Sequence, residues 1–518
     1  MCGIAVVHDL SPDAATHERL AATRALGEDM LSRLHHRGPD GSGTRQVGAT
    51  WLGHTRLSIV DLDGGEQPLH SPHGERWVVA NGEIYNHETL RSHLPGPFVT
   101  DSDSEIVLHV VDRLGTDGIH DMRGMYAFCT ATREGDVVLA RDPLGVKPLY
   151  WARVDDRVVA ASELWAFPAE LRADLEEFPP GHHWTPATGL TPFVDLRTDP
   201  LGAAARPSAE LVDRGEALAA IRETLVAGVR ERMMADVPVG VFLSGGLDSS
   251  IIAAILARLS EPGSVVRSFA AGTEGSSDLA AARVVAEHLG LEHHERVYTD
   301  EDVVAVLPQV VRATESYEPS LVRSAVPNFL LAELAARHLK VVLTGEGADE
   351  LFAGYHHFRE MDVPALRAAL ADGVDGLHHL NLQRCDRVTM AHGLEARVPF
   401  LSRDMLALSL RIPMEWKLLG DDGQEQAQEK ALLREAFAGW LPEEILWRRK
   451  EQFGDGSGTA QVMSRQAERL VPDEDWSRAR ITGLPAARSR EELAYQRIFA
   501  AHLGGIRAEQ VLGRFATA

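Results

Sequence analysis

The first 165 residues alternate short apolar runs with clusters of turn-forming residues, a pattern typical of a β-rich domain. Turns at 37–41, 63–65 and 134–136 separate several of the runs. The β-like runs themselves are 4–7, 48–51, 77–80, 125–130, 137–140 and 157–161. Apolar residues recur at helical spacing only near 16–33 and 104–114. Many strands with few helices predict a layered sandwich of sheets.

The pattern changes beyond residue 208, where helices and strands are expected to alternate. Helical runs at 214–234, 249–259, 278–289 and 325–338 are interleaved with apolar strands at 239–243, 265–270 and 340–343. Such alternation predicts a parallel sheet with helices on both faces. Between the two patterns, residues 198–207 have little periodicity and include Pro200 and Pro207. We therefore predict two domains, at residues 2–200 and 208–518.

Composition and charge narrow the classes of function. The chain has 518 residues, 44% of them hydrophobic and 25% charged, which is typical of a soluble globular protein. Its formal net charge of −24 argues against a broad nucleic-acid surface, because such a surface would repel phosphates. There is no apolar run of about 18 residues, so no membrane partner is expected. No signal-peptide pattern opens the chain, and three cysteines indicate no disulfide framework, so we expect the cytoplasm.

Cys2 is a candidate nucleophile because it directly follows the initiator methionine. Removal of Met1 would leave a thiol and an α-amine on one residue, and an α-amine with a pKa of about 7.7–8.0 can serve as the base. By itself, a cysteine at position two is more often an ordinary strand residue. Its surroundings favour catalysis, since 54–61, 81–86 and 102–105 are rich in groups that could bind an oxyanion, a carboxylate or an amine.

These segments, with 37–40 and 140–150, resemble the glutaminase domain of class II glutamine amidotransferases. The resemblance implies an α+β N-terminal-nucleophile sandwich of antiparallel sheets. It further implies that Cys2 is the nucleophile and that Asn81 and Gly82 form the oxyanion hole. Arg56 would bind the substrate carboxylate, and Glu83 and Asp103 would bind its α-amine.

A second chemical motif follows the apolar strand at 239–243. The sequence Ser-Gly-Gly-Leu-Asp-Ser-Ser occupies 244–250 and leads into a helix. Glycines let the backbone approach an anion, and a helix N-terminus offers free N–H groups, so this loop is a candidate phosphate site. It matches neither the Walker A pattern nor the dinucleotide fingerprint. It resembles the pyrophosphate loop of α/β domains of the ATP-pyrophosphatase type, in which Asp248 would face Mg²⁺.

Segments 343–350, 386–401 and 448–458 complete a resemblance to the glutamine-dependent asparagine synthetases, which covers the chain from Cys2 to about residue 458. It implies that Glu346 is the general base and Lys450 the lysine that stabilises phosphate charge. Asp349 and Asp386 would shape the substrate site, and Arg323 would bind the aspartate carboxylate. The residues implied to bind ATP are Leu243, Ser244, Gly245, Gly246, Asp248, Ser249, Thr344 and Gly345.

The predicted reaction hydrolyses glutamine at Cys2, passes ammonia to a second site and uses ATP to adenylylate aspartate, which yields asparagine, AMP and pyrophosphate. The family resemblance also implies a homodimer. Ser320, Leu321 and Ser402 depart from the family's pattern, so another carboxylic acid remains an alternative acceptor. A ring-forming relative would have no use for a glutaminase, and a non-catalytic binding protein would not need candidate residues at both sites.

Five adjacent histidine pairs lie at 35–36, 182–183, 293–294, 356–357 and 378–379. None has the i,i+4 or C-x₂₋₄-C spacing of a zinc motif. We therefore predict that they are surface or hydrogen-bonded side chains.

Overall fold

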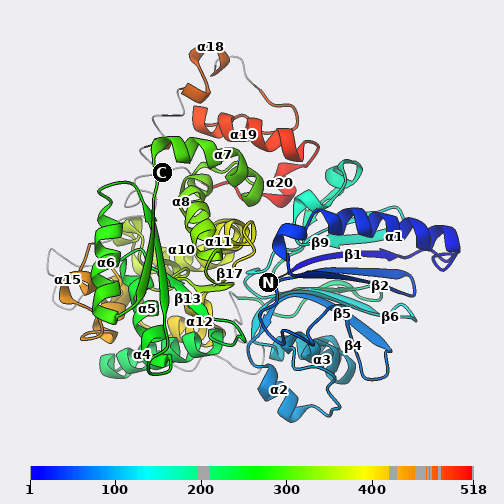
Figure 1. The fold of residues 1–518 in the computed structure, drawn as a ribbon, viewed down its shortest axis with the longest axis horizontal. Coiled ribbons are helices and arrows are strands. Elements are labelled where there is room, and N and C mark those ends of the chain that lie inside the picture. The colour runs from blue at the N-terminus through cyan, green and yellow to red at the C-terminus, as the bar shows by residue number, and fades with distance from the viewer. Residues whose placement is uncertain are drawn as a thin grey trace.

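The computed structural model describes residues 2–196, 210–418, 429–449, 462, 463, 466, 469–476 and 480–515. Its named strands form three sheets, two antiparallel ones in the first part of the chain and one parallel sheet in the second (Figure 1). The first sheet has the order β10-β8-β9-β1-β3-β2. Its strands are β1 (Gly3–Asp9), β2 (Gly41–Val47), β3 (Thr50–Arg56), β8 (Tyr150–Val154), β9 (Arg157–Ala161) and β10 (Glu176–Glu177).

The second sheet, of order β12-β11-β7-β6-β5-β4, lies face to face with the first (Figure 1). Its strands are β4 (Leu69–His70), β5 (Arg76–Ile84), β6 (Gly124–Thr132), β7 (Val137–Arg141), β11 (His182–Thr185) and β12 (Gly189–Pro192). Alternate residues of each strand point to opposite faces. Ile4 and Val6 of β1 therefore pack with Val79 and Cys129 in the core between the sheets.

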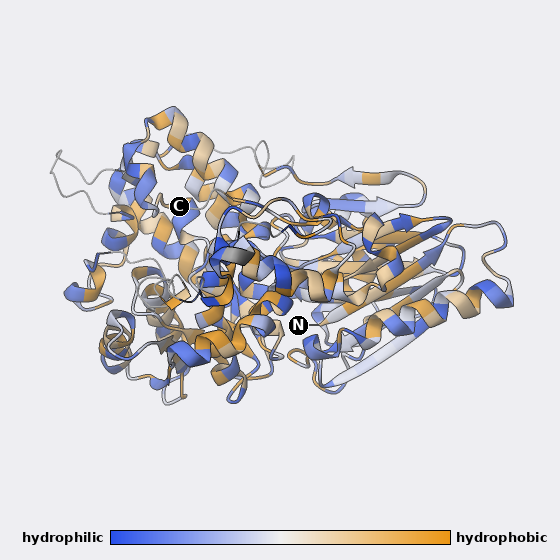
Figure 2. Cartoon of the chain, turned by 90° about the horizontal axis from the view of Figure 1, so that it is seen from above, coloured by the Kyte–Doolittle hydropathy of each residue, from blue (hydrophilic) through white to orange (hydrophobic). Residues whose placement is uncertain are grey.

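The outer face of each sheet is covered by a helix, which gives four layers. Ala5 and Val7 pack with Met30 of α1 (His17–Ser32) on one side. On the other side, Val78 and Ala80 pack with residues of α3 (Ile106–Leu114). β1, β3, β6 and β7 are therefore buried along almost their whole length, whereas β2 and β12 at the sheet edges are more exposed and β2 is largely polar (Figure 2). This is the N-terminal-nucleophile sandwich that the family resemblance implied.

The third sheet is parallel, with the order β15-β14-β13-β16-β17. Its strands are β13 (Val239–Phe242), β14 (Arg267–Gly272), β15 (Glu292–Val297), β16 (Val341–Leu343) and β17 (Glu395–Arg397). In Figure 1 these strands run between α6 (Ser277–Leu289) on one side and α8 (Pro319–Ala336) on the other, and both helices contact β14. The α/β architecture expected for the second domain is confirmed.

The remaining helices complete the second half of the molecule. α4 (Arg214–Arg232) and α5 (Leu247–Leu259) contact each other, as do α7 (Asp300–Thr314) and α8, and α8 and α11 (Asn381–Met390). α19 (Arg490–Leu503) packs on α7, and α20 (Ala508–Val511) packs on β10 of the first half. Shorter helices are α2 (His87–His93), α9 (Ala348–Leu351), α10 (Val363–Gly376), α12 (Arg403–Arg411), α13 (Met414–Leu418), α14 (Ala431–Ala436), α15 (Glu443–Leu446) and α18 (Asp473–Trp476).

Most of the predicted elements are confirmed, and two differ in their bounds. The run at 48–51 covers the turn after β2 and only the first two residues of β3, which continues to Arg56. The helix expected at 325–338 begins six residues earlier, at Pro319, where a proline at the first helical position needs no hydrogen-bond partner. The domain boundary predicted near residues 200–208 stays a prediction, since 197–209 lie outside the described residues. Within the described part of the chain, no helix is long and apolar enough to cross a bilayer.

Candidate active site

Cys2 lies where the two antiparallel sheets meet. It directly precedes β1, and its backbone N–H donates a 3.1 Å hydrogen bond to Oδ1 of Asn81 in β5 of the other sheet. Asn81 is fully buried, and its side-chain Nδ2 has no hydrogen-bond partner among the described residues. Leaving a buried donor unsatisfied costs about 1–3 kcal/mol. This N–H₂ group is therefore available to an oxyanion beside the Cys2 thiol.

Gly82 follows Asn81 and cannot be replaced without distorting the sheet. Its φ of +140° is disfavoured for other residues, and an added Cβ would lie 1.9 Å from the carbonyl oxygen of Met125 in β6. The Asn-Gly pair of β5 thus places an amide donor next to a backbone without a side chain, close to the start of β1.

The environment of the Cys2 thiol favours its protonated form. Burial raises the pKa of this thiol most, and the carboxyl groups of Glu83 and Glu395 raise it further, while the backbone N–H of Leu57 lowers it. A thiol of this kind needs a base to become a nucleophile. The α-amine that removal of Met1 would expose is the base the sequence predicts.

Glu83 and Asp103 form a buried acidic pair next to Cys2. Burial raises the pKa of both carboxyl groups, and for Glu83 the charges of Glu395 and Asp103 add to this effect. Oδ2 of Asp103 accepts a hydrogen bond of 2.6 Å from the backbone N–H of Ile84, and Oε2 of Glu83 has no partner among the described residues. A cationic α-ammonium would relieve this crowding of negative charge, which fits the role implied for the pair.

Arg56, the residue expected to bind the substrate carboxylate, ends β3 and is itself largely buried. Its guanidinium donates to the backbone carbonyls of Val60, Asp61 and Leu62. These hydrogen bonds hold the loop at 60–62 against the Arg56 side chain. Any contact with a substrate would have to share or replace these bonds.

The predicted phosphate loop has the expected strand–loop–helix geometry between β13 and α5. Gly245 has a φ of +70°, and a Cβ there would lie 2.5 Å from the backbone of α6, so only glycine allows this close approach. Ser244 and Ser249 bond to each other within the loop, with their Oγ atoms 3.1 Å apart. Gly345 packs against the start of α5, where a Cβ would lie 2.9 Å from the backbone nitrogen of Ser249.

Lys430 is a member of this site that the sequence analysis did not identify. Its Nζ forms ion pairs with Asp248, in α5, and with Oδ1 of Asp349, in α9, the latter at 2.7 Å. Lys430 is only 3% exposed, and the two carboxylates raise its pKa despite the opposing effect of burial. One buried cation thus joins two of the acidic residues that the sequence analysis selected. Because Lys430 is more than 80 residues from either carboxylate in the sequence, no local pattern could predict these ion pairs.

Arg448 provides a second unpredicted contact with the phosphate loop. Its guanidinium donates 2.9 Å to Oδ1 of Asp278 and 3.4 Å to the carbonyl of Gly245. Arg448 precedes Lys450 by two residues, and Lys450 itself lies outside the described residues. Its predicted role therefore stays a prediction.

Three further predicted site residues form ion pairs or hydrogen bonds with other residues of the chain: Glu346, Thr344 and Arg323. Glu346 is paired with Arg384 of α11. The backbone N–H of Thr344, at the end of β16, donates 2.9 Å to the carbonyl of Arg397 in β17. Arg323, expected to bind aspartate, instead has its Nε 2.8 Å from Oε1 of Glu491 in α19. A substrate carboxylate would have to compete with Glu491 for this guanidinium.

Leu243, which the sequence predicts to contact ATP, lies directly after β13. It is fully buried, and its N–H donates to the carbonyl of Phe269 at 2.8 Å. The loop that follows is therefore anchored to the neighbouring strand β14 by a backbone bond.

Asp386 lies at the contact between the two halves of the molecule. Oδ2 accepts 3.0 Å from NH1 of Arg37, in the 3₁₀ turn His35–Arg37, and Oδ1 lies 3.5 Å from Nζ of Lys147. Arg397 of β17 also crosses this contact, with NH2 3.4 Å from Oε1 of Glu83. Two buried arginines thus connect the surroundings of Cys2 to α11 and β17 of the second half of the molecule.

The departures at 321 and 402 have structural explanations. Ser402 caps α12, because its Oγ accepts 3.2 Å from the N–H of Met405, and aspartate is equally favoured at this cap. Leu321 is fully buried in α8.

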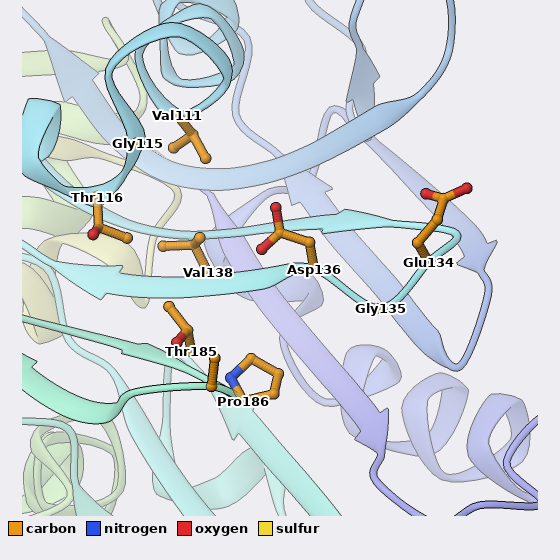
Figure 3. Close-up of a pocket in the computed structure, with 10 residues that line it drawn as sticks. Val111, Gly115, Thr116, Glu134, Gly135, Asp136, Val138, Thr185 and Pro186 are labelled. Carbon is orange, nitrogen blue, oxygen red and sulfur yellow. The ribbon is translucent and has the colours of Figure 1, made fainter.

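A separate surface hollow lies at the far end of the sandwich (Figure 3). It is lined by Val111, Gly115, Thr116, Glu134, Gly135, Asp136, Val138, Thr185, Pro186 and Ala187. None of these residues belongs to the predicted sites.

Two family models match the chain, one for each half. The model described as "Glutamine amidotransferase domain" matches residues 1–179, and the one described as "Asparagine synthase" matches 220–372 and 362–512. The chain is 35% identical to "Probable asparagine synthetase [glutamine-hydrolyzing]" from Dictyostelium discoideum, over 99% of this chain and 96% of that protein. It is 38% identical to "Asparagine synthetase [glutamine-hydrolyzing]" from Sandersonia aurantiaca (88% and 87% covered) and 36% identical to the "Probable" one from Schizosaccharomyces pombe (96% and 93%).

Proposed function

Because the chain belongs to the family of glutamine-hydrolysing asparagine synthetases, we propose that it moves the amide nitrogen of glutamine onto the side-chain carboxylate of aspartate, using ATP. The observation that carries the proposal is the presence, in one chain, of Cys2 against the buried Asn81 amide and of a phosphate loop at Ser244–Ser249. We further propose a division into domains at 2–200 and 208–518, a homodimer and a cytoplasmic location.

In the first reaction, the Cys2 α-amine takes the thiol proton and Sγ attacks the side-chain carbonyl carbon of glutamine. The C–N bond breaks, ammonia leaves with the proton, and water hydrolyses the resulting thioester to glutamate. Asn81 Nδ2 and the backbone of Gly82 stabilise the oxyanion, while Glu83 and Asp103 hold the α-ammonium. Arg56 holds the substrate carboxylate.

In the second reaction, a carboxylate oxygen of aspartate attacks the α-phosphorus of ATP and pyrophosphate leaves. Ammonia then attacks the acyl carbon, AMP leaves, and Glu346 accepts the surplus proton. Ser244, Gly245, Gly246 and Ser249 cradle the pyrophosphate, and Leu243, Thr344 and Gly345 border the nucleotide. Arg323 and Asp386 belong to the acceptor side.

The donor set at Asp248 and Asp349 fits Mg²⁺, because both ligands are carboxylates that face one another through Lys430. We propose that Asp248 binds the ion. When bound, Mg²⁺ neutralises charge on the leaving pyrophosphate. Lys430 holds the two carboxylates together by pairing with both, and we propose that Lys450 contributes further positive charge.

The experiment that tests the proposal replaces the nucleophile and leaves the second site intact. Cys2→Ala should lose glutamine-dependent formation of asparagine and AMP, and should retain formation from ammonium salts. Cys129→Ala is the matched control, because Cys129 is buried between the sheets and burial raises the pKa of its thiol. This variant should retain both activities. Glutamine-dependent synthesis by Cys2→Ala, or faster pyrophosphate release with another carboxylic acid than with aspartate, would overturn the proposal.

A further inference from the structure

We propose that Glu177, His378 and His379 form a zinc site between the two halves of the molecule, independent of the proposed catalysis. Glu177 lies in β10 at the edge of the first sheet, and the two histidines end the 3₁₀ turn Leu377–His379 just before α11. One ligand atom from each residue lies within 4.8 Å of the others. The fold therefore brings the Glu177 carboxylate to two adjacent histidines that lie 201 and 202 residues further along the chain.

The distances match those around a tetrahedral zinc ion. Nε2 of His378 and of His379 lie 3.5 Å and 3.0 Å from the same oxygen, Oε2 of Glu177. Ligand atoms about 2.0–2.1 Å from a tetrahedral metal are roughly 3.3 Å apart. The two imidazole rings are also adjacent, with centroids 4.1 Å apart. Small rotations of these side chains would place the three ligand atoms at three corners of a tetrahedron around the ion.

The Glu177 carboxylate is already oriented for this role. NH1 of Arg141 donates 2.7 Å to Oε1, which leaves Oε2 directed at the histidines. Arg141 is fixed in turn, because its Nε donates 2.7 Å to the carbonyl of Lys147. Outer hydrogen bonds of this kind hold metal-binding carboxylates in place. The Arg141 charge also keeps the pKa of Glu177 well below its usual value, despite the opposing effect of burial.

His378 is available as a neutral ligand. Burial lowers its pKa, even though Glu177 acts in the opposite direction. Zinc binds neutral imidazole, so the site does not have to displace a proton from this ring at neutral pH. The side chains of His378 and His379 are 14% and 25% exposed, which leaves access for the ion and for a water as fourth ligand.

The pair at 293–294 shows why adjacency alone is not enough. These histidines lie in β15, where successive side chains point to opposite faces. Each contacts a different carboxylate, His293 with Glu295 and His294 with Glu292. The pair at 378–379 differs because both rings face one oxygen.

The test uses the full-length chain without a polyhistidine tag, freed of metal with EDTA and dialysed. Calorimetric titration with ZnCl₂ should show one ion per chain, and MgCl₂ should show no binding at this site, since Mg²⁺ prefers oxygen ligands. His379→Ala should weaken zinc binding by a factor of about 100, and Glu177→Gln, which keeps an acceptor for Arg141, should do the same. Zinc should raise the melting temperature of the wild type and not of these variants.

His294→Ala is the matched control and should bind zinc like the wild type. Cobalt(II) in place of zinc should give tetrahedral d–d absorption without a sulfur-to-metal charge-transfer band, which excludes the cysteines as ligands. Should His379→Ala fail to fold, His379→Gln serves in its place. Equal zinc affinity in the wild type and in the folded variants, or a sulfur band, would overturn the assignment.

Discussion

Arg37 and Asp386 form a fully buried, bidentate ion pair that joins the glutaminase half of the molecule to helix α11, with NH1–Oδ2 and NH2–Oδ1 distances of 3.0 and 3.3 Å. The same guanidinium donates 3.1 Å from Nε to the carbonyl oxygen of Cys2 and 2.7 Å from NH1 to Glu163. One side chain therefore fixes the backbone of the nucleophile and the contact between the two halves.

This arrangement predicts strong energetic coupling between Arg37 and Asp386. Arg37→Ala or Asp386→Ala should each lower the free energy of unfolding by about 3–5 kcal/mol, because a charged partner stays buried and uncompensated. The double variant should lose less than the two single losses combined, with a coupling of about 0.5–3 kcal/mol. Urea unfolding of the four proteins measures this. Arg33→Ala, which breaks an exposed pair with Asp29, is the control and should change stability by under about 0.5 kcal/mol. Additive losses would contradict the coupling.

Asn81 should act on the glutaminase reaction alone. Asn81→Ala removes the buried Nδ2 donor and should lower the kcat of glutamine hydrolysis by about 10²–10³, the usual effect of losing one oxyanion donor. Ammonia-dependent synthesis should be close to that of the wild type. The control is Asn86→Ala, since the side chain of Asn86 bonds to the backbone of Asp121 and Arg123, away from Cys2. A similar loss in both reactions would mean that Asn81 supports the fold and not the oxyanion.

Lys430 should act on the synthetase reaction alone. Lys430→Met leaves Asp248 and Asp349 without the cation that holds them, so the phosphate site should lose its geometry and pyrophosphate release should fall by about 10² or more. Glutamine hydrolysis at Cys2 should continue. Lys340→Met is the control, because Lys340 forms a half-exposed pair with Asp40. Retained pyrophosphate release in Lys430→Met would show that the lysine has only a structural role.

The parts of both sites that lie in contiguous segments could be predicted from the sequence. Asn81-Gly82 lies within one strand, and the loop at Ser244–Ser249 lies between a strand and a helix, so local pattern and chemistry suffice. The strand β15 was not predicted because Glu292, His293, His294 and Glu295 hide it in a polar run. Its side chains are paired with each other and with arginines, and this keeps them out of an apolar core.

Contacts between distant segments could not be predicted. Lys430 pairs with Asp248 across 182 residues, and Arg37 pairs with Asp386 across 349. Motifs identified Asp248 and Asp386 but did not show which cation pairs with each, because any buried carboxylate can accept any cation that the fold brings to it. Likewise, no pattern in the sequence indicated that Glu491 forms an ion pair with Arg323.

The last prediction concerns pH and rests on Glu350, a buried side chain of α9 that is 3% exposed. Its Oε1 accepts hydrogen bonds from Tyr355 at 2.6 Å and Asn381 at 2.9 Å, and Oε2 has no partner among the described residues. Burial, and then the charge of Asp349, raise the pKa of Glu350 to about 7 from an ordinary value of 4.5. The native state therefore prefers the protonated carboxyl group.

A raised pKa fixes the sign of the pH effect. Below pH 4.5 the group is protonated in both states and its contribution to stability is fully present; that contribution is lost as the pH rises through about 7, where the buried group must ionise. At 1.36 kcal/mol per pKa unit the loss is about 3 kcal/mol at most. Glu350→Gln stays neutral, so its free energy of unfolding minus that of the wild type should increase between pH 4.5 and 8. Urea unfolding at several pH values measures this difference, and Glu287→Gln, at an exposed position, should show no such trend. A difference independent of pH would mean that the pKa of Glu350 is not raised in the folded protein, with Tyr355 and Asn381 sufficient to hold the charge.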